Sequence, residues 1–316
     1  MGSGSRKNHV VLLPLTDLVA RATLQVQGYQ SRKVATSAGR IHVLEADGRG
    51  NLPPIVLLHG LSSAGAHYLP LLHRLRPAVR HLAAPDMPAH GFSDHPPQMN
   101  GESLEAGLVE ALDDIIKEPS ILFGNSLGGI AAIHYALRRP ERVKALILAS
   151  PSGAPMTAEE LERFVATFHI GTHAEALAFI DKVLAKPGLL RHAFAVGVGA
   201  RFKKRYVQEL LASIKPEDLL RSEQLKALHM PILLLWGKSE RILPRAHLEW
   251  FRKNLPAHAR IEEPVGFGHS PFLDDSPGLA KRILAFCREV TAPPGRDTKP
   301  GWLARAFSRA TAASAL

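Results

Sequence analysis

Short apolar runs alternate along much of the chain with stretches in which apolar residues recur at helical spacing. The runs that predict strands are 41–45, 55–58, 81–85, 121–123, 143–149, 232–236 and 260–262. Helical periodicity is found in 102–117, 127–138, 245–254 and 277–290. The strand runs lack polar alternation, which is typical of strands that helices cover on both faces. The pattern therefore predicts an α/β fold with a mostly parallel central sheet flanked by helices.

The alternation of strands and helices stops between residues 151 and 229, where the pattern is helical throughout. Thr157 and Glu160 form one capping box at the start of a helix, and Thr172 and Glu175 form a second. Apolar residues at helical spacing follow each of them. We interpret 151–229 as a helical cap inserted between two strands of a core that comprises 31–150 and 230–290.

Both ends of the chain carry amphipathic segments outside this core. In residues 1–30, one face of a predicted helix collects Leu12, Leu15, Leu18, Val19 and Ala22. Such a helix packs on the core or lies against a membrane surface. Residues 291–316 begin as a proline-rich linker and end in a short amphipathic tail. The apolar run near the N-terminus is too short to span a membrane. We therefore expect a cytoplasmic protein, with peripheral membrane contact as an open alternative.

Charge and cysteine content narrow the class of protein. The chain has 316 residues, with 39 Lys and Arg against 29 Asp and Glu, and its formal net charge is +10. Positive charge attracts polyanions, but here it is scattered and no nucleic-acid-binding motif accompanies it. The densest run, 203–205, fits the solvated face of a helix. One cysteine, Cys287, excludes an internal disulfide framework. We expect no nucleic-acid partner, and the sequence does not indicate the oligomeric state.

A glycine-rich motif of the form G-x-S-x-G lies between the strand 121–123 and the helix 127–138. Its residues are Gly124-Asn125-Ser126-Leu127-Gly128. A strand-to-helix turn this sharp forces the serine into strained backbone angles, and the flanking glycines are needed because any Cβ would clash. The turn lifts the serine hydroxyl clear of the sheet and aims the helix N-terminus at it. Ser126 is therefore the candidate nucleophile.

A serine hydroxyl needs a base whose pKa lies near the working pH. His269 follows the last predicted strand and precedes the last helix, which places it on a loop at one edge of the sheet. The imidazole must in turn be oriented by an acid, and Glu240 follows the strand 232–236. The resulting chain order of serine, acid and histidine is the order expected for this elbow chemistry.

Two backbone N–H groups are needed to stabilise the oxyanion of an acyl-transfer reaction. Leu127, directly after the serine, offers one of them at a helix N-terminus, and Leu61 offers the other. His59 is a rival for the role of base, but its position just after a strand suits a loop-shaping role. Gly60 lets the backbone turn back close to the substrate. Asn125 belongs to the supporting loops together with His59 and Gly60.

Together these segments resemble the α/β-hydrolase fold superfamily over residues 30–290. The matching landmarks, in order, are His59-Gly60, the loop 86–93, the elbow at Ser126, Trp236-Gly237 and Gly268-His269. A closer resemblance to the capped serine esterases and monoacylglycerol-lipase-like proteins comes from residues 59–61, 86–88 and 236–238. Glu240 stands where the family usually has Asp, and Ala89 replaces a common Gly.

The function implied is a serine hydrolase that cleaves small-molecule acyl esters through an acyl-enzyme on Ser126, with no metal or organic cofactor. Carbon–carbon bond hydrolases of the meta-cleavage type share the Gly-Asn-Ser elbow, but they usually carry a Ser-Gly-Pro-rich loop where this chain has Leu61-Ser62-Ser63-Ala64. An acyltransferase would use the same triad. A non-catalytic binding protein on this fold would be expected to have lost Ser126 or His269. The ester and its acyl chain length are not encoded in any motif.

Overall fold

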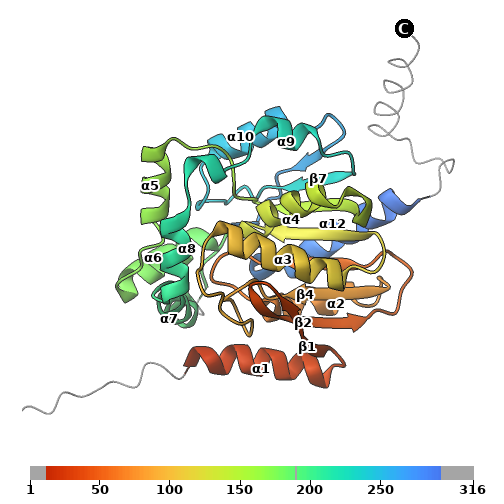
Figure 1. Ribbon diagram of the computed structural model, residues 1–316, viewed down its shortest axis with the longest axis horizontal. Coiled ribbons are helices and arrows are strands. Elements are labelled where there is room, and N and C mark those ends of the chain that lie inside the picture. Colours follow the sequence, from red (N-terminus) through yellow and green to blue (C-terminus); the bar gives the residue numbers. More distant parts are fainter. Residues whose placement is uncertain (1–11, 189–190, 293–316) are drawn as a thin grey trace, which may run out of the picture.

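The computed structural model describes residues 12–188 and 191–292, and its centre is an eight-stranded sheet with the order β1-β2-β4-β3-β5-β6-β7-β8 (Figure 1). The strands are β1 Gln30–Thr36, β2 Gly39–Asp47, β3 Ile55–Leu58, β4 His81–Pro85, β5 Ser120–Asn125, β6 Val143–Ala149, β7 Ile232–Leu235 and β8 Arg260–Glu262. β2 runs antiparallel to β1 and β4, whereas the pairs from β4 to β8 are parallel. The predicted α/β fold with a mostly parallel sheet is confirmed.

The sheet is buried on both faces because its strands are apolar at consecutive positions. In β3, Val56 and Leu58 belong to one hydrophobic cluster, and Ile55 and Leu57 belong to the other. The first cluster lies beneath α3 Gly101–Ile115, α4 Leu127–Arg138 and α10 Arg245–Asn254. The second lies beneath α2 Leu69–Leu75 and α12 Ser276–Thr291. This two-sided burial explains why the strand runs show no polar alternation.

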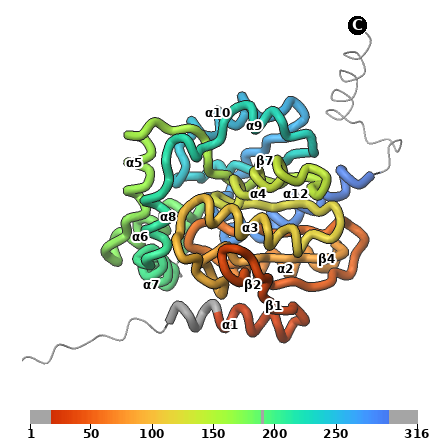
Figure 2. The backbone as a smooth tube through the Cα atoms, in the orientation of Figure 1, coloured from red at the N-terminus to blue at the C-terminus, as the bar shows by residue number. Residues whose placement is uncertain are grey.

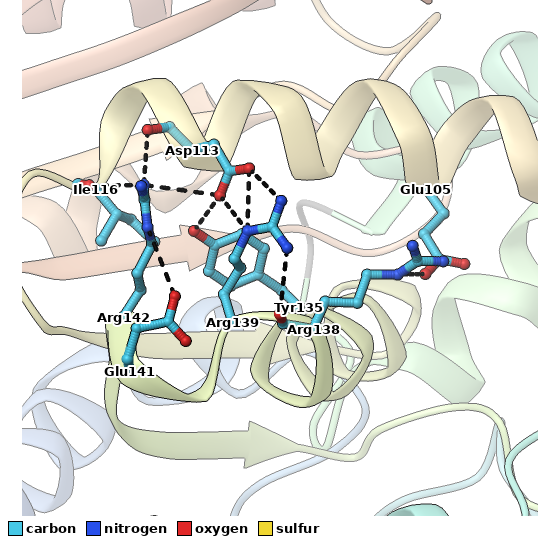
Figure 3. A network of polar contacts seen from close by, with 8 residues as sticks. All are labelled: Glu105, Asp113, Ile116, Tyr135, Arg138, Arg139, Glu141 and Arg142. Carbon is cyan, nitrogen blue, oxygen red and sulfur yellow. Dashed lines mark hydrogen bonds and ion pairs between the residues drawn. The ribbon is translucent and has the colours of Figure 1, made fainter.

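A polar network fixes α3 against α4, the helix that begins at the elbow (Figure 3). The carboxylate of Asp113 accepts a hydrogen bond from Tyr135 Oη at 3.0 Å and from Arg139 Nη2 at 2.9 Å. Arg142 donates to the Asp113 carbonyl at 2.9 Å. Burial opposes ionisation of Asp113, but the hydrogen bonds from Arg139 and Tyr135 outweigh it and lower the pKa of the carboxyl. The network therefore anchors the C-terminal end of α4 to α3.

Helices fill the insertion between β6 and β7. They are α5 Ala158–Ala166, α6 His173–Val183, α7 Arg191–Phe202, α8 Arg205–Ser213 and the short α9 Ser222–Lys226. Both predicted capping boxes are confirmed: Thr157 and Glu160 cap α5, and Thr172 and Glu175 cap α6. Helices α5 to α8 gather at one side of the sheet, whereas α9 leads back toward β7 (Figure 1). The limits of the cap, 151–229, stay a prediction.

Two elements at one edge of the fold bear on the expectations drawn from the sequence pattern. The first is β1, which was not among the predicted strands. Its sequence is polar, and Val34 is its one buried residue. It pairs only with β2, so it forms an edge of the sheet. Charged residues such as Arg32 and Lys33 are common on edge strands because they discourage pairing with other chains. Because such an edge strand buries few side chains, its sequence shows little of the hydrophobic pattern from which strands are predicted.

The second feature is α1 Leu12–Val26, which lies beside β1 at the edge of the fold (Figure 2). The helix packs on the core through Leu24, which is fully buried. Leu18, Val19 and Val26 are instead 44%, 56% and 90% exposed. The described part of the apolar face predicted from the sequence therefore faces outward. Among the described residues, no helix is both long enough and apolar enough to cross a bilayer. The predicted C-terminal tail, 291–316, lies almost wholly outside the described residues.

Candidate active site

The elbow holds Ser126 between β5 and α4 in a strained conformation. Its φ of 54° lies in the left-handed region, and its ψ is −118°. Non-glycine residues adopt such angles at a cost of about 1–3 kcal/mol, and they cluster at functional sites. The hydroxyl of Ser126 does not cap α4. The strain therefore frees the hydroxyl from the hydrogen bond that a serine at a helix start usually makes.

Glycines make this turn possible because the backbone passes too close for side chains. A Cβ on Gly128 would lie 2.0 Å from the carbonyl oxygen of Leu58, and one on Gly124 would lie 2.2 Å from that of Gly128. Neither distance is compatible with a side chain. The elbow thus packs directly against the end of β3, where the loop that begins at His59 starts.

His269 and Glu240 meet above the ends of two neighbouring strands. Glu240 lies in the loop after β7, and His269 lies in the loop after β8. Nδ1 of His269 and Oε2 of Glu240 are 2.8 Å apart. The second oxygen, Oε1, accepts the N–H groups of Ile242 at 2.7 Å and Leu243 at 3.0 Å. Both carboxylate oxygens therefore have partners, and the extra methylene of Glu compared with Asp is accommodated by the loop.

The environment of Glu240 keeps its carboxylate ionised. Its side chain is only 2% exposed, and burial by itself would raise its pKa. The positive charge of a protonated His269 and the hydrogen bonds from His269, Ser150 and Leu243 outweigh burial and bring the pKa to about 2. A fixed negative charge beside Nδ1 keeps the proton of the neutral imidazole on Nδ1 and leaves Nε2 as the acceptor.

The hydroxyl of Ser150 is a contact of Glu240 that the sequence analysis missed. Ser150 lies directly after β6, with a φ of 41°. Its N–H donates to the carbonyl of Leu235 at the end of β7, which brings the residue to the neighbouring acid loop. The signal available in the sequence was its position at the end of a buried strand, at the same edge of the sheet as the other site residues.

Asn125 connects the elbow to the histidine loop. Its Nδ2 donates to the carbonyl of Ala149 at 2.9 Å and to the carbonyl of His269 at 2.8 Å. The side chain is 2% exposed, so these bonds are shielded from water. The residue beside Ser126 therefore fixes the backbone of His269 relative to the serine.

The loop after β3 brings Gly60 and Leu61 to the elbow. A Cβ on Gly60 would lie 3.3 Å from Cβ of Ser126. His59 is fully buried: its Nε2 accepts the N–H of Met87 at 3.0 Å, and its Nδ1 lies 2.8 Å from the carbonyl oxygen of Gly60. Burial lowers the pKa of His59 and keeps the ring neutral. His59 thus shapes the loop, and its two ring nitrogens are occupied by backbone groups.

Ser126 and His269 line one large cavity of about 1590 Å³. Gly60, Leu61 and Leu127 also line it. Much of its wall comes from apolar side chains of α5 to α8 and of the link between α5 and α6: Leu161, Phe164, Phe168, Phe179, Ile180, Val198, Phe202, Leu210 and Leu211. Its volume exceeds the range of about 300–1,000 Å³ that is usual for small-molecule sites. Leu127 is the first residue of α4, so its N–H has no carbonyl acceptor within the helix.

The end of α6 is fastened to the histidine and acid loops, a connection that no sequence motif indicated. The N–H of His269 donates to the carbonyl of Val183 at 2.9 Å. The carboxylate of Asp274 accepts the N–H of Gly268 at 2.7 Å and the N–H of Ala185 at 2.8 Å. Arg241 donates to the carbonyl of Leu184 at 2.5 Å. The cap insertion and the two loops therefore form one hydrogen-bonded unit.

Sequence comparison defines the class of protein. A family model described as the alpha/beta hydrolase family matches residues 55–282, and the chain belongs to this family. An sn-1-specific diacylglycerol lipase of Mus musculus is 28% identical over 260 residues, which are 76% of this chain and 82% of that protein. A pimeloyl-[acyl-carrier protein] methyl ester esterase of Xanthomonas campestris pv. campestris is 30% identical over 252 residues, or 75% of this chain and 96% of that protein.

Solved structures show the same fold. A membrane phospholipase A matches with a TM-score of 0.76 and 24% identity, over 90% of this chain and 94% of that one. A 2-hydroxy-6-oxo-6-phenylhexa-2,4-dienoate hydrolase from Rhodococcus sp. strain RHA1 matches with a TM-score of 0.71 and 22% identity, over 82% of this chain and 99% of that one. Within the described ranges, no cluster of His, Cys, Asp and Glu side chains has the arrangement of a metal site.

Proposed function

We propose that this α/β hydrolase is a serine esterase or lipase that cleaves carboxylic esters through an acyl-enzyme on Ser126. The observation that carries the proposal is the shared cavity: it contains the strained Ser126 and also His269, whose Nδ1 lies 2.8 Å from the buried carboxylate of Glu240. A nucleophile, a base and an acid that orients the base are the three parts that acyl transfer needs.

In the first half of the reaction, Oγ of Ser126 attacks the ester carbonyl carbon while Nε2 of His269 takes the hydroxyl proton. The carbonyl oxygen becomes an oxyanion, and the N–H groups of Leu61 and Leu127 stabilise it. Glu240 stabilises the imidazolium that has formed, without taking its proton. The carbonyl re-forms as the carbon–oxygen bond to the alcohol breaks, and the alcohol leaves with the proton from His269. The acyl group remains on Ser126.

In the second half, water replaces the alcohol. His269 removes a proton from the water as its oxygen attacks the acyl carbon, and the same two N–H groups stabilise the second oxyanion. Collapse releases the carboxylic acid, and the proton on His269 returns to Oγ of Ser126. The enzyme is regenerated, so the balance is one ester and one water converted into one acid and one alcohol.

The apolar wall formed by α5 to α8 supports a role for these helices as a cap that roofs an acyl pocket. The curated relatives are named as an sn-1-specific diacylglycerol lipase and as a methyl ester esterase. Both names describe the cleavage of carboxylic esters, which agrees with the chemistry proposed for Ser126. The large apolar cavity favours esters with a long acyl group, because burial of each methylene contributes about 0.8 kcal/mol.

The proposal is tested with p-nitrophenyl esters of increasing chain length, monoacylglycerols and a ring-cleavage dienone. We expect turnover of the esters, loss of that turnover in Ser126→Ala, and covalent labelling of Ser126 by an organophosphonate. Ser152→Ala, which removes another serine of the same cavity, serves as the matched control and is expected to retain activity. Turnover of the dienone without turnover of any ester, or label on a different residue, would contradict the proposal.

A further inference from the structure

An apolar surface on the outside of α1 has no partner within the described fold. Leu18, Val19, Ala22 and Val26 are exposed and fall within about a third of the helix circumference, since one residue turns an α-helix by about 100°. The exposed Gln25 lies at the margin of this stripe. The side that contacts the core includes Leu24. A surface helix normally buries its apolar stripe and exposes its polar one. Exposure of four apolar residues on one side therefore indicates a surface that another apolar phase covers.

The exposed surface continues onto the cap at the rim of the cavity. Helix α1 contacts α7, and Figure 2 shows the two helices at the same end of the molecule. Phe194 and Val196 of α7 are 38% and 41% exposed, and both line the cavity that contains Ser126. Ala20 of α1 lines it as well. Residues that both line a cavity and reach solvent mark its opening, so the apolar surface adjoins an entrance to the candidate active site.

Basic groups flank the other end of this surface. Val26 lines a shallow depression together with Arg49, His73 and Arg76. Arg49 and His73 are exposed. Arg76 donates to the backbone carbonyls of Gln27, Gly28 and Asp47, and no carboxylate among the described residues forms an ion pair with it. Together with the net charge of +10, these groups favour an anionic partner.

We propose that the exposed sides of α1 and α7 form a docking surface for an anionic phospholipid bilayer. Apolar side chains would enter the interface while cations contact the lipid head groups, as amphipathic helices do at membrane surfaces. The docked orientation places the entrance beside Phe194 and Val196 against the lipid. A long-chain ester can then pass from the bilayer into the cavity without crossing water. This inference concerns where the substrate comes from and does not depend on which bond is cleaved.

The test is sedimentation of the full chain with vesicles of phosphatidylcholine alone or mixed with phosphatidylglycerol. We expect binding to the anionic vesicles that weakens between about 0.01 M and 0.15 M salt, where the screening length falls from about 30 Å to about 8 Å. The double variant Val19→Ser/Val26→Ser should bind about ten-fold more weakly or worse, because two apolar side chains no longer leave water. Arg49→Gln should weaken binding to the vesicles that contain phosphatidylglycerol and should not change binding to vesicles of phosphatidylcholine alone.

Val265→Ser is the matched control. Val265 is 79% exposed and follows β8, at the opposite edge of the sheet from β1 and α1. Its replacement should leave vesicle binding unchanged. All variants should keep the unfolding temperature and the turnover of a soluble short-chain ester, which shows that the fold and site are intact.

Three results would overturn the proposal. The double variant could bind vesicles as the wild type does, which would assign any binding to another part of the chain. Val265→Ser could weaken binding to the same extent, which would remove the specificity of the surface. Finally, the wild type could fail to bind vesicles and instead form a dimer, while the variant Val19→Ser/Val26→Ser is a monomer. That result would make the surface an interface between two copies of the chain.

Discussion

Replacement of Glu240 by Gln tests the proposed site most directly, because it removes a charge and changes little else. The Gln side chain has the same length and can still accept the N–H groups of Ile242 and Leu243 through its carbonyl oxygen. In that orientation its NH₂ group faces Nδ1 of His269, where Oε2 of Glu240 now lies at 2.8 Å. The reverse orientation would set the NH₂ group against two N–H donors and lose both bonds.

An NH₂ group beside Nδ1 changes which nitrogen of His269 carries the proton. Nδ1 must then accept a hydrogen bond, so the proton of the neutral ring moves to Nε2. In the proposed mechanism Nε2 takes the proton of Ser126, but in this tautomer Nε2 has no free lone pair. The imidazolium also loses the fixed negative charge beside it. We expect kcat/KM to fall about 10⁴-fold, equivalent to about 5.5 kcal/mol of transition-state stabilisation.

The assay is turnover of a p-nitrophenyl ester by the wild type, Glu240→Gln, Glu240→Asp and the control Glu223→Gln. Glu223 is exposed on α9, so its replacement should leave kcat/KM close to that of the wild type. Glu240→Asp keeps the charge and should retain substantial activity. If Glu240→Gln stayed within about ten-fold of the wild type while folding normally, Glu240 would not be the residue that orients the base.

Three further predictions concern stability, the cap and the cavity. The pKa of Glu240, about 2 in the folded protein against an ordinary value of 4.5, corresponds to about 3 kcal/mol of stability. Because the folded-state pKa is the lower one, this contribution is present above pH 4.5 and is lost as the pH falls toward 2. Acid titration followed by circular dichroism should therefore show that Glu240→Gln loses less of its stability between pH 4.5 and pH 2 than the wild type does. Equal losses of stability would refute the lowered pKa of Glu240. Asp274→Asn places an NH₂ group against one of two N–H donors, so it should lower the free energy of unfolding by about 1–3 kcal/mol. It should also reduce the turnover of long esters more than the control Asp275→Asn does. Equal turnover in the two variants would show that the hydrogen bonds of Asp274 to Gly268 and Ala185 are not needed for activity. Val198→Trp should shift the preference toward shorter acyl chains, measured with the p-nitrophenyl series, and an unchanged profile would place the acyl chain elsewhere.

The sequence pattern predicts those parts of the fold whose side chains are buried on all sides. A strand such as 143–149 can be predicted without knowing which elements pack against it, because a fully buried strand is apolar at each position. The edge strand β1 has one buried residue, Val34, and its partner on only one side, so it has little pattern to detect. For α1, helical spacing identifies an apolar face, but it does not state whether that face meets protein or solvent.

The same reasoning explains which parts of the candidate site the sequence could indicate. Ser126 lies in a local motif, since the strain of the elbow is set by its neighbouring glycines. Glu240 and His269 follow β7 and β8, and the carboxyl ends of parallel neighbours meet at one edge of a sheet. Their approach therefore follows from topology. The contacts of Ser150 and Asp274 join segments far apart along the chain through common residue types, and only the folded structure reveals them.

Contacts between segments far apart along the chain determine how the proposed site is held together. The backbone of His269 is fixed on three sides: its carbonyl accepts from Asn125 of the elbow, its N–H donates to Val183 of the cap insertion, and its side chain meets Glu240. Gly268 permits this approach, because a Cβ there would lie 2.6 Å from the carbonyl oxygen of Val183. A cap that moved as a rigid body would break the bond to His269. The end of α6 is therefore expected to stay in place during turnover, so that substrate enters past α1 and α7, where the exposed apolar rim lies.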